Sequence, residues 1–350
     1  MKPVIICGGI GSKMWPESRV KTPKHFLPIF SGKSMFEINW SSLRKQYKAD
    51  EIFLQTNACQ AEIAKKLVPE IVEENIFIEP EMRNQGPATG FAAAMLKMRG
   101  LGDEPFMLIQ ADLLHMDEDL FLKSIVIAGE MATKEKVYIT GSMVPTQIVE
   151  GVDYLIKGEL LREENGIELY RVADYVDRTE KEKIKTMLGS KDLLLHWNHT
   201  TMTPNNLLEM YEKYRPDWSE PLQKIIEGGD VATNYALMPK GPIEEVTAKV
   251  HRDGGSVVMV FPFEIWDFGT WGSIENYEKQ QNTQTEGNQK IEIESQNNYV
   301  RSKKMVALIG VEDLVVVDTP DALLICKKDK AGKVGQVVDA LKAGNKTELL

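Results

Sequence analysis

The stretch that decides the fold is residues 4–16, which read VIICGGIGSKMWP in one-letter code. The apolar run at residues 4–6 predicts a buried strand, and a glycine-rich turn follows it directly. Glycines without a Cβ let backbone N–H groups approach an anion closely, and Lys13 and Lys24 bring mobile positive charge just beyond the turn. The pattern therefore predicts a site for the phosphates of a nucleotide.

Two commoner phosphate-binding motifs do not fit this stretch. A dinucleotide fingerprint requires a third glycine at the position that Met14 occupies. A Walker A loop requires a glycine ahead of Gly-Lys-Ser, and the candidate at residues 32–34 has Leu27 at that place. An ordinary glycine turn between a strand and a helix remains an alternative for residues 8–11 taken alone.

Strand-like and helix-like segments alternate along the first part of the chain. Strands are expected at residues 4–6, 51–55, 76–78, 106–109 and 136–140. Helices are expected at residues 35–47, 61–68, 88–98 and 119–133. Such alternation predicts an α/β fold with a Rossmann-like mixed, mainly parallel sheet flanked by helices, in which ligands bind at the carboxyl ends of the strands.

The composition of the sequence changes after Trp271. Residues 278–289 are rich in Gln, Asn, Thr and Glu, which indicates a linker or an exposed turn. Short strand-like runs and then an amphipathic helix follow, at residues 305–309, 314–317, 322–326 and 334–341 in that order. We therefore expect a large domain at residues 1–275 and a small β-rich domain at residues 276–350, with too few turns to predict a hexapeptide solenoid.

The overall composition argues against several classes of protein. The chain has 350 residues, of which 43% are hydrophobic, and its net charge of −10 argues against a nucleic-acid partner. Cys7, Cys59 and Cys326 show neither metal-ligand spacing nor a disulfide framework, which favours a reducing cytoplasm. No apolar run reaches the roughly 20 residues of a membrane helix, and the chain leaves no room for a signal peptide before its first strand.

Two motifs at the start of the chain resemble a known family. Residues 8–19 read GGIGSKMWPESR, and residues 23–27 read PKHFL. Nucleotide-sugar pyrophosphorylases of the mannose-1-phosphate guanylyltransferase type open with Gly-Gly-x-Gly-Thr-Arg-Leu-Trp-Pro-x-Ser-Arg and then Pro-Lys-Gln-Phe-Leu. The resemblance implies the nucleotide-diphospho-sugar transferase fold with a small β-rich C-terminal domain, and a homodimer formed through such domains. It also implies a short form, since the chain ends before the isomerase domain that some members add.

A second block, at residues 79–89, is similar to the family's Glu-Pro-x-x-Arg-Asn-Thr-Ala-Pro-Ala segment. Its Asn84 and Gln85 offer amide groups to a base edge or a ribose, and its Pro87 and Ala88 start a helix whose N–H groups face the pocket. A polar loop that only caps this helix is the alternative. The resemblance implies contacts with the nucleotide from Gly8, Gly9, Gly11, Ser12, Lys13, Lys24, Asn84, Gln85, Pro87, Ala88 and Ala111.

Two acids complete the site that the resemblance implies. Asp112 follows a strand-like run, and Asp267 lies in residues 265–271, IWDFGTW, which resemble the family's Trp-x-Asp-x-Gly-Ser-Trp. By that resemblance the two carboxylates hold Mg²⁺ between them, and hard oxygen ligands suit this ion. Without the resemblance, each acid would be interpreted as a helix cap or a turn residue.

The implied reaction is nucleotidyl transfer. A phosphate oxygen of a sugar 1-phosphate attacks the α-phosphorus of a nucleoside triphosphate, and pyrophosphate leaves without a covalent enzyme intermediate. We expect GTP and α-D-mannose 1-phosphate as substrates and GDP-mannose as the product. The residues expected to act in catalysis are Lys13, Lys24, Asp112 and Asp267, with the lysines neutralising the triphosphate.

The segments expected to bind the sugar phosphate depart from the family. Asp153 stands where members have a glycine, and we expect its carboxylate to accept hydrogen bonds from sugar hydroxyls. The family's Glu-Lys-Pro becomes Asp177-Arg178-Thr179, which keeps an acid and a phosphate-binding cation. The family's Ser-Ile-Asp-Tyr-Ala is matched to residues 232–236, which lack the acid. The expected sugar-phosphate contacts are Gly151, Asp153, Asp177, Arg178 and Asn198.

These departures keep two alternatives open. The first is a nucleotidyltransferase for a different sugar 1-phosphate, and the base is also open, because a few amide contacts separate guanine from uracil or thymine. The second is a catalytically weak paralogue that senses a nucleotide and controls a partner. A sensor has little need for both metal-binding acids, so the retention of Asp112 and Asp267 argues against it.

Overall fold

The computed structural model describes residues 1–149, 151–281 and 290–350. The strands of its main sheet are β1 Lys2–Ile6, β2 Phe53–Thr56, β3 Ile76–Ile78, β4 Phe106–Gln110, β6 Tyr138–Met143, β7 Tyr154–Glu164, β8 Ile167–Val176, β9 Leu193–His196, β10 Thr201–Met202 and β11 Ser256–Val260. The helices around this sheet are α1 Met35–Leu43, α2 Ala58–Leu67, α3 Gln85–Met98, α4 Glu118–Glu135, α5 Lys181–Met187, α6 Pro204–Tyr214, α7 Pro216–Ile226, α8 Val231–Leu237, α9 Glu244–Arg252 and α10 Trp271–Gln280.

The main sheet is mixed, and its two halves differ in strand direction. Its strand order is β11-β8-β7-β9-β6-β10-β4-β1-β2-β3. Strands β4, β1, β2 and β3 are parallel neighbours, and β6 also pairs in parallel with β11. The hairpin β7–β8 and the short strands β9 and β10 pair antiparallel. The predicted α/β class is therefore confirmed, with parallel pairing concentrated among the first strands of the chain.

Most of the predicted elements in the first half of the chain are present with shifted ends. The helix expected at 61–68 begins earlier, because Asn57 caps it by accepting a hydrogen bond from the backbone N–H of Gln60. The prediction did not include the long hairpin β7–β8. Its turn holds Asn165 at φ 54° and Gly166 at φ 78°, and an Asn-Gly pair is the residue signal for such a tight turn.

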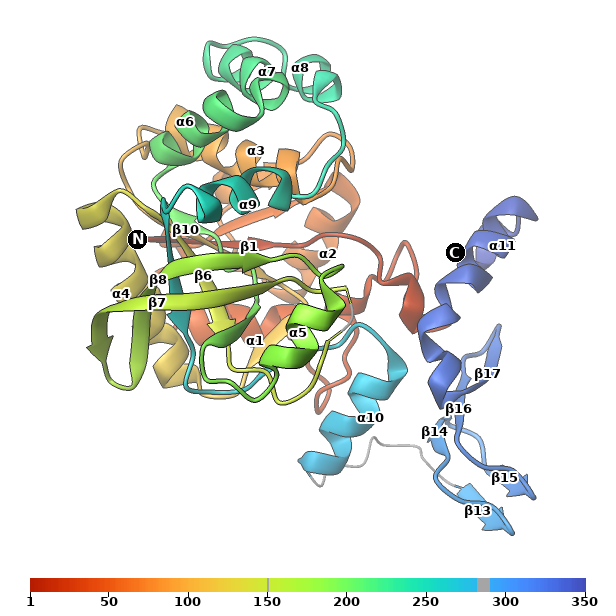
Figure 1. Ribbon diagram of the computed structural model, residues 1–350. Coiled ribbons are helices and arrows are strands. Elements are labelled where there is room, and N and C mark those ends of the chain that lie inside the picture. The colour runs from red at the N-terminus through yellow and green to blue at the C-terminus, as the bar shows by residue number, and fades with distance from the viewer. Residues whose placement is uncertain (150, 282–289) are drawn as a thin grey trace.

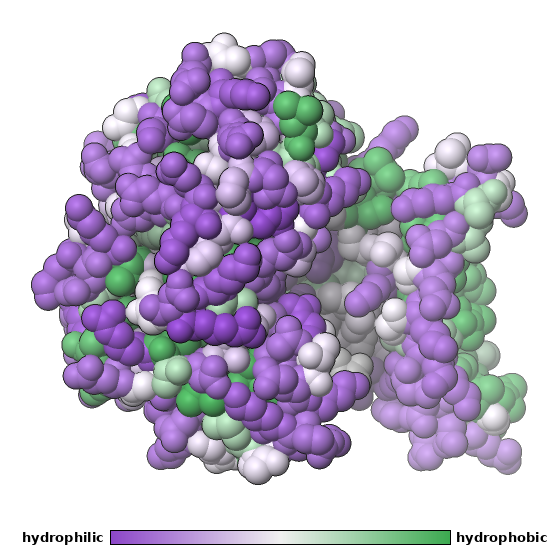
Figure 2. Space-filling model, turned by 45° about the horizontal axis from the view of Figure 1, so that its top comes forward, coloured by the Kyte–Doolittle hydropathy of each residue, from purple (hydrophilic) through white to green (hydrophobic). Residues whose placement is uncertain are grey.

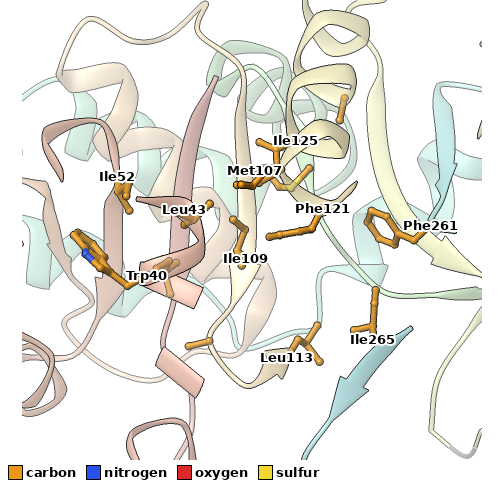
Figure 3. Packing of buried hydrophobic residues seen from close by; sticks show 14 of the residues in the cluster. Trp40, Leu43, Ile52, Met107, Ile109, Leu113, Phe121, Ile125, Phe261 and Ile265 are labelled. Atoms are coloured by element: carbon orange, nitrogen blue, oxygen red, sulfur yellow. The ribbon is translucent and has the colours of Figure 1, made fainter. Parts of the chain in front are cut away.

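Two hydrophobic layers cover the two faces of the sheet, because alternate residues of a strand point to opposite sides. On β1, Ile5 packs with the layer that contains α1 and α4, whereas Val4 packs with the layer that contains α3, α6 and α7. Figure 3 shows Met107 and Ile109 of β4 between side chains of α1 and α4. Figure 1 shows α3, α6, α7, α8 and α9 gathered on one side of the sheet.

The smaller unit is a short β-helix with two parallel strand pairs and a last strand that pairs antiparallel with its neighbour. Its strands are β13 Lys290–Ile293, β14 Tyr299–Arg301, β15 Val306–Ile309, β16 Leu314–Asp318 and β17 Leu323–Lys327, and helix α11 Gly335–Ala343 follows. Lys290 pairs in parallel with Val306, and Tyr299 pairs with Val315, so each coil takes 16 residues. The sequence had shown too few turns to predict a solenoid. The β-rich domain is confirmed, and the coil explains how so short a segment forms it.

The predicted linker at residues 278–289 is wrong at its start. Residues 278–280 form the last turn of α10, and residues 282–289 lie outside the described residues. The predicted domain boundary after residue 275 falls within this helix and stays a prediction. In the described residues, no helix is both long enough and apolar enough to span a bilayer.

The β-helix unit and α11 pack against the end of the glycine-rich stretch. The indole Nε1 of Trp15 donates to the carbonyl oxygen of Leu349 at 3.0 Å, and Nε1 of Trp271 donates to the carbonyl oxygen of Trp15 at 3.1 Å. Arg301 Nε lies 2.5 Å from Glu17 Oε1, and both side chains are at least four-fifths buried. Segments from the C-terminal part of the chain therefore hold this stretch in place (Figure 1).

Candidate functional site

A cavity of about 390 Å³ lies at the carboxyl ends of β1 and β4. In a parallel sheet this edge is where ligands bind, because the connections to the helices open there. Eight of the predicted nucleotide or catalytic residues line the cavity, namely Gly8, Gly9, Gly11, Lys24, Asn84, Gln85, Ala88 and Asp112. The glycine-rich turn and the start of α3 therefore form two walls of one pocket.

Gly11 lets Lys24 cross the glycine-rich turn. Its φ of 76° lies in the left-handed region, and a Cβ at this position would come within 2.6 Å of Lys24 Cγ. The backbone N–H of Lys24 also donates to the carbonyl oxygen of Ile10 at 3.2 Å. The missing side chain at Gly11 thus fixes the path by which Lys24 reaches the pocket floor.

Lys24 brings together the two acids that the resemblance implied. Its Nζ lies 2.6 Å from Asp112 Oδ2 and 3.8 Å from Asp267 Oδ1. Strands β5 Leu113–His115 and β12 Ile265–Asp267 pair antiparallel with Asp267 opposite Leu113, so Asp267 lies beside the residue that follows Asp112. The pairing of two short strands thus places both carboxylates beside the ammonium group of Lys24.

The two carboxyl groups have opposite pKa shifts. Burial would raise the pKa of Asp112, but the Lys24 ammonium and its hydrogen bond hold this pKa below the ordinary value. Burial and the charge of Asp112 raise the pKa of Asp267, against the opposing effect of Lys24. The pKa of Lys24 is raised, because its two acid partners outweigh the effect of burial. At neutral pH a charged lysine therefore lies between two acids that repel each other.

A second cavity of about 230 Å³ adjoins the first. Its lining includes Gly151, Asp153, Arg178 and Asn198, which are four of the five predicted sugar-phosphate residues. Gln110 and Asp112 line both cavities, and Asp267 lines the second. The two acids are therefore placed at the border between the two pockets, where a group bound in one would meet a group bound in the other.

Five predicted site residues line neither cavity in the part of the chain that is described. Pro87 and Ala111 are buried in the packing of the sheet and its helices, and Lys13 is exposed, although its charge acts to lower the pKa of Asp267. Ser12 lies against Gly335 of the C-terminal unit. The Asp177 carboxylate accepts hydrogen bonds from Thr179 and so closes its own turn. The contacts predicted for Ser12, Lys13, Pro87, Ala111 and Asp177 remain predictions.

The expectation that Asp153 offers its carboxylate to sugar hydroxyls does not match its placement. Its side chain is only 1% exposed, and both of its oxygens accept hydrogen bonds from Arg178. The hairpin β7–β8 brings the two residues close, because Tyr154 pairs with Val176 and the backbone N–H of Arg178 donates to Asp153 Oδ1 at 2.8 Å. Asp153 therefore contacts the guanidinium group of Arg178 at the wall of the second cavity.

Sequence reasoning missed several polar residues of the two cavities, among them two acids and an amide. Glu79 lines the first cavity, Glu244 lines the second and Gln110 lines both. Glu79 lay within the quoted second block, so a signal for it was available. Glu244 was missed because the family's acidic segment was matched to residues 232–236, none of which lines either cavity among the described residues. The acid expected to be lost at this site is thus supplied from the start of α9.

Comparison with known proteins agrees with this architecture. A family model described as nucleotidyl transferase matches residues 2–150, and a model described as MannoseP isomerase/GMP-like beta-helix domain matches residues 288–341. A solved structure described as mannose-1-phosphate geranyltransferase from Thermus thermophilus superimposes with a TM-score of 0.82, over 97% of this chain and 99% of that one, at 22% identity. Fold and site together thus define a nucleotidyltransferase with an appended β-helix.

Two relatives show which kind of nucleotidyltransferase the chain is similar to. The mannose-1-phosphate guanylyltransferase of Escherichia coli (strain K12) is 29% identical over 359 residues, which cover 99% of this chain and 74% of the relative. The protein of the same name from Salmonella muenchen is 28% identical over 356 residues, with the same coverage. The chain is a homologue of the mannose-1-phosphate guanylyltransferases.

We predict that Gly11→Ala weakens nucleotide binding about tenfold, because a left-handed residue with a Cβ costs on the order of 1–3 kcal/mol and the new methyl group displaces Lys24. Titration calorimetry with GTP measures this effect. Gly166→Ala is the matched control, since Gly166 also has a positive φ but lies in the β7–β8 turn outside both cavities. Equal affinity of Gly11→Ala and the unaltered protein would contradict the role given to Gly11.

Proposed function

We propose that this protein transfers a guanylyl group from GTP to a sugar 1-phosphate, with α-D-mannose 1-phosphate as the acceptor, to give GDP-mannose and pyrophosphate. The observation that carries the proposal is the cluster of Lys24, Asp112 and Asp267 at the border of two adjoining cavities. The names of the relatives support the same acceptor and donor. The first cavity then receives the nucleotide, and the second receives the sugar.

The chemistry needs positive charge more than it needs an acid or a base. A phosphate oxygen of the acceptor forms a bond to the α-phosphorus, the bond from that phosphorus to the bridging oxygen breaks, and pyrophosphate leaves with the electron pair. Both reactants are anions, so the site must reduce their repulsion and stabilise charge in the transition state. Lys24 supplies a fixed positive charge at the border, because its two acid partners keep it protonated.

The two acids fit a divalent cation. Asp112 and Asp267 present carboxylate oxygens to one point, and the side chain of Asp267 is 51% exposed and therefore accessible. Burial and, to a smaller extent, the charge of Asp112 raise the pKa of Asp267, and a bound cation would relieve the repulsion between the two carboxylates. Hard oxygen ligands favour Mg²⁺, which would be held by these two residues and would supply Lewis-acid stabilisation of phosphate oxygens when bound.

Glu79 supports guanine as the base. It lines the first cavity, and Tyr235 donates a hydrogen bond to its Oε1 at 2.5 Å, which fixes the carboxyl group at the cavity wall. Guanine presents two adjacent donors, N1–H and the N2 amino group, whereas uracil and thymine present a single N3–H between two carbonyl oxygens. A carboxylate is the better partner for two adjacent donors.

The second cavity offers hydrogen-bonding groups suited to sugar hydroxyls. Asn198 Nδ2 donates to Glu244 Oε1 at 3.2 Å, which orients both side chains. Asn198 Oδ1 is buried and has no partner among the described residues, so an acceptor remains available. The acceptor that we propose carries hydroxyls able to use these groups, and a different sugar 1-phosphate is the nearest competitor.

Three further proposals concern the whole chain. We propose a large domain at residues 1–275 and a small one at residues 276–350. A cytoplasmic location is supported by the free thiols of Cys7, Cys59 and Cys326. A homodimer formed through the β-helix is supported by large apolar side chains that are exposed there. Figure 2 shows hydrophobic residues along the outer side of the smaller unit, and Met305, Ile309 and Ile325 are each more than half exposed.

Asp112→Asn should lower turnover of GTP with mannose 1-phosphate by about two to three orders of magnitude, because it removes one charge from the cluster at the reacting phosphates. Pyrophosphate release measures the turnover, and calorimetry should find GTP affinity changed less than turnover. Asp119→Asn is the control, since Asp119 is exposed on α4. Full turnover by Asp112→Asn would refute the proposed role. A protein that binds GTP but turns over no sugar 1-phosphate would be a sensor.

Glu79→Gln should shift the base preference from GTP toward UTP or dTTP, because an amide presents one acceptor and one donor where the carboxylate presents acceptors only. The expected change in the ratio of kcat/KM values is about 10- to 100-fold, in line with the loss of a charge-assisted hydrogen bond. Glu81→Gln is the matched control, since Glu81 belongs to the same loop and pairs with Arg83 outside the cavity. An unchanged preference would remove Glu79 from base recognition.

The double variant Ile309→Glu, Ile325→Glu should convert a dimer into a monomer, because charge on both sides of the apolar surface opposes its burial. Sedimentation velocity measures the change. Leu237→Glu serves as control, since Leu237 is 60% exposed on α8 in the larger unit. A monomeric unaltered protein, or a dimer that persists in the double variant, would contradict pairing through the β-helix.

A further inference from the structure

Most of the hydrogen-bond donors of Arg178, at the wall of the second cavity, already have partners within the protein. Its Nε lies 2.8 Å from Asp153 Oδ1, its Nη2 lies 2.5 Å from Asp153 Oδ2, and its backbone N–H also donates to Asp153 at 2.8 Å. The same Nη2 lies 3.2 Å from Glu244 Oε1, and Nη1 lies 2.6 Å from the carbonyl oxygen of Gly151. The planar fork of the guanidinium is thus filled by one carboxylate.

The number of donors on the guanidinium limits what Arg178 can offer a ligand. An arginine side chain has five N–H donors, and four of them reach the partners just named. One Nη1 hydrogen is left without a partner among the described residues. Phosphate recognition by arginine usually takes two parallel N–H groups of the fork, and here Asp153 occupies the pair formed by Nε and Nη2.

The net charge around Arg178 also disfavours the binding of a phosphate. Asp153 and Glu244 both contact Arg178, so the group of three has one more negative than positive charge. The Asp153 carboxylate is 1% exposed, and it therefore receives little screening from solvent. A phosphate dianion that approached Arg178 would meet two carboxylates, whereas a neutral hydroxyl would meet one free donor.

We propose that Asp153 is a specificity-determining residue that holds Arg178 as a single hydrogen-bond donor to a sugar hydroxyl and prevents it from binding the phosphate of the acceptor. This inference rests on the proposed function and deepens it. The acceptor phosphate then lies at the border with the first cavity, near Lys24, and the sugar ring lies against Arg178, Asn198 and Glu244. Selection among sugars follows from the hydroxyl that meets the one free N–H.

The test compares phosphate binding with and without the Asp153 carboxylate. Calorimetry of the whole chain with inorganic phosphate should give about tenfold tighter binding to Asp153→Ala than to the unaltered protein, since a released guanidinium fork gains a charge-assisted bond worth on the order of 1.5 kcal/mol. Asp153→Asn should fall between the two, because an amide keeps one acceptor and the side-chain volume. Asp174→Ala is the matched control. Asp174 lies on strand β8 of the same hairpin, pairs with Lys183 of α5 and does not line the cavity.

Kinetics provides an independent readout. With GTP as donor, Asp153→Ala should bring the KM values of different hexose 1-phosphates together and leave the KM for GTP within about twofold. Where Asp153→Ala does not fold by circular dichroism, Asp153→Asn decides. Unchanged or weaker phosphate binding in both variants would overturn the inference. A protein without turnover refutes the proposed function only, and the phosphate titration then still decides whether Asp153 restrains Arg178.

Discussion

One ammonium group shared by two carboxylates organises this site. Lys24 comes from a short helical turn at Lys24–Phe26, beyond the glycine-rich turn, Asp112 follows the end of β4 and Asp267 ends β12, so three separate segments meet at one charge. Two carboxylates at such close range would repel each other without a cation between them, and the raised pKa of Asp267 records part of that repulsion. Lys24 lines the first cavity, and its partner Asp112 lines both cavities, so this cluster lies where the two cavities adjoin.

The glycine-rich stretch that Lys24 crosses is held at its later end by the C-terminal part of the chain. Gly11 gives Lys24 room to cross the turn, and the indoles of Trp15 and Trp271 tie the following residues to the C-terminal part of the chain. The β-helix unit therefore contributes to the site without lining either cavity in the described residues. A small domain can act in this way because buried indole hydrogen bonds and the Arg301–Glu17 ion pair have well-defined geometry.

The two cavities differ in their electrostatics. The first is lined by glycines, amides and Lys24, with Glu79 and Asp112 as its acids. The second has four acids in its lining, and two of them, Asp153 and Glu244, together offset the charge of Arg178. A sugar with several hydroxyls fits such a lining better than a bare phosphate does. The asymmetry supports our proposal that the acceptor is recognised chiefly by its ring and that its phosphate lies at the shared border.

Elements that depend on neighbouring residues could be predicted from the sequence. The strand and glycine turn at residues 4–16 and the acid at the end of β4 were predicted in this way, and the Asn57 cap and the Asn165-Gly166 turn could have been. Contacts between distant side chains could not be predicted. The pairing of β12 with β5 brought Asp267 to Asp112, the coil of 16 residues formed a β-helix from few turns, and the hairpin turned Asp153 toward Arg178. Glu244 lines the second cavity, although the family's acidic segment had been matched to residues 232–236. The physical reason is that local conformation depends on adjacent residues, whereas charge pairing depends on distances that exist only once the chain has folded.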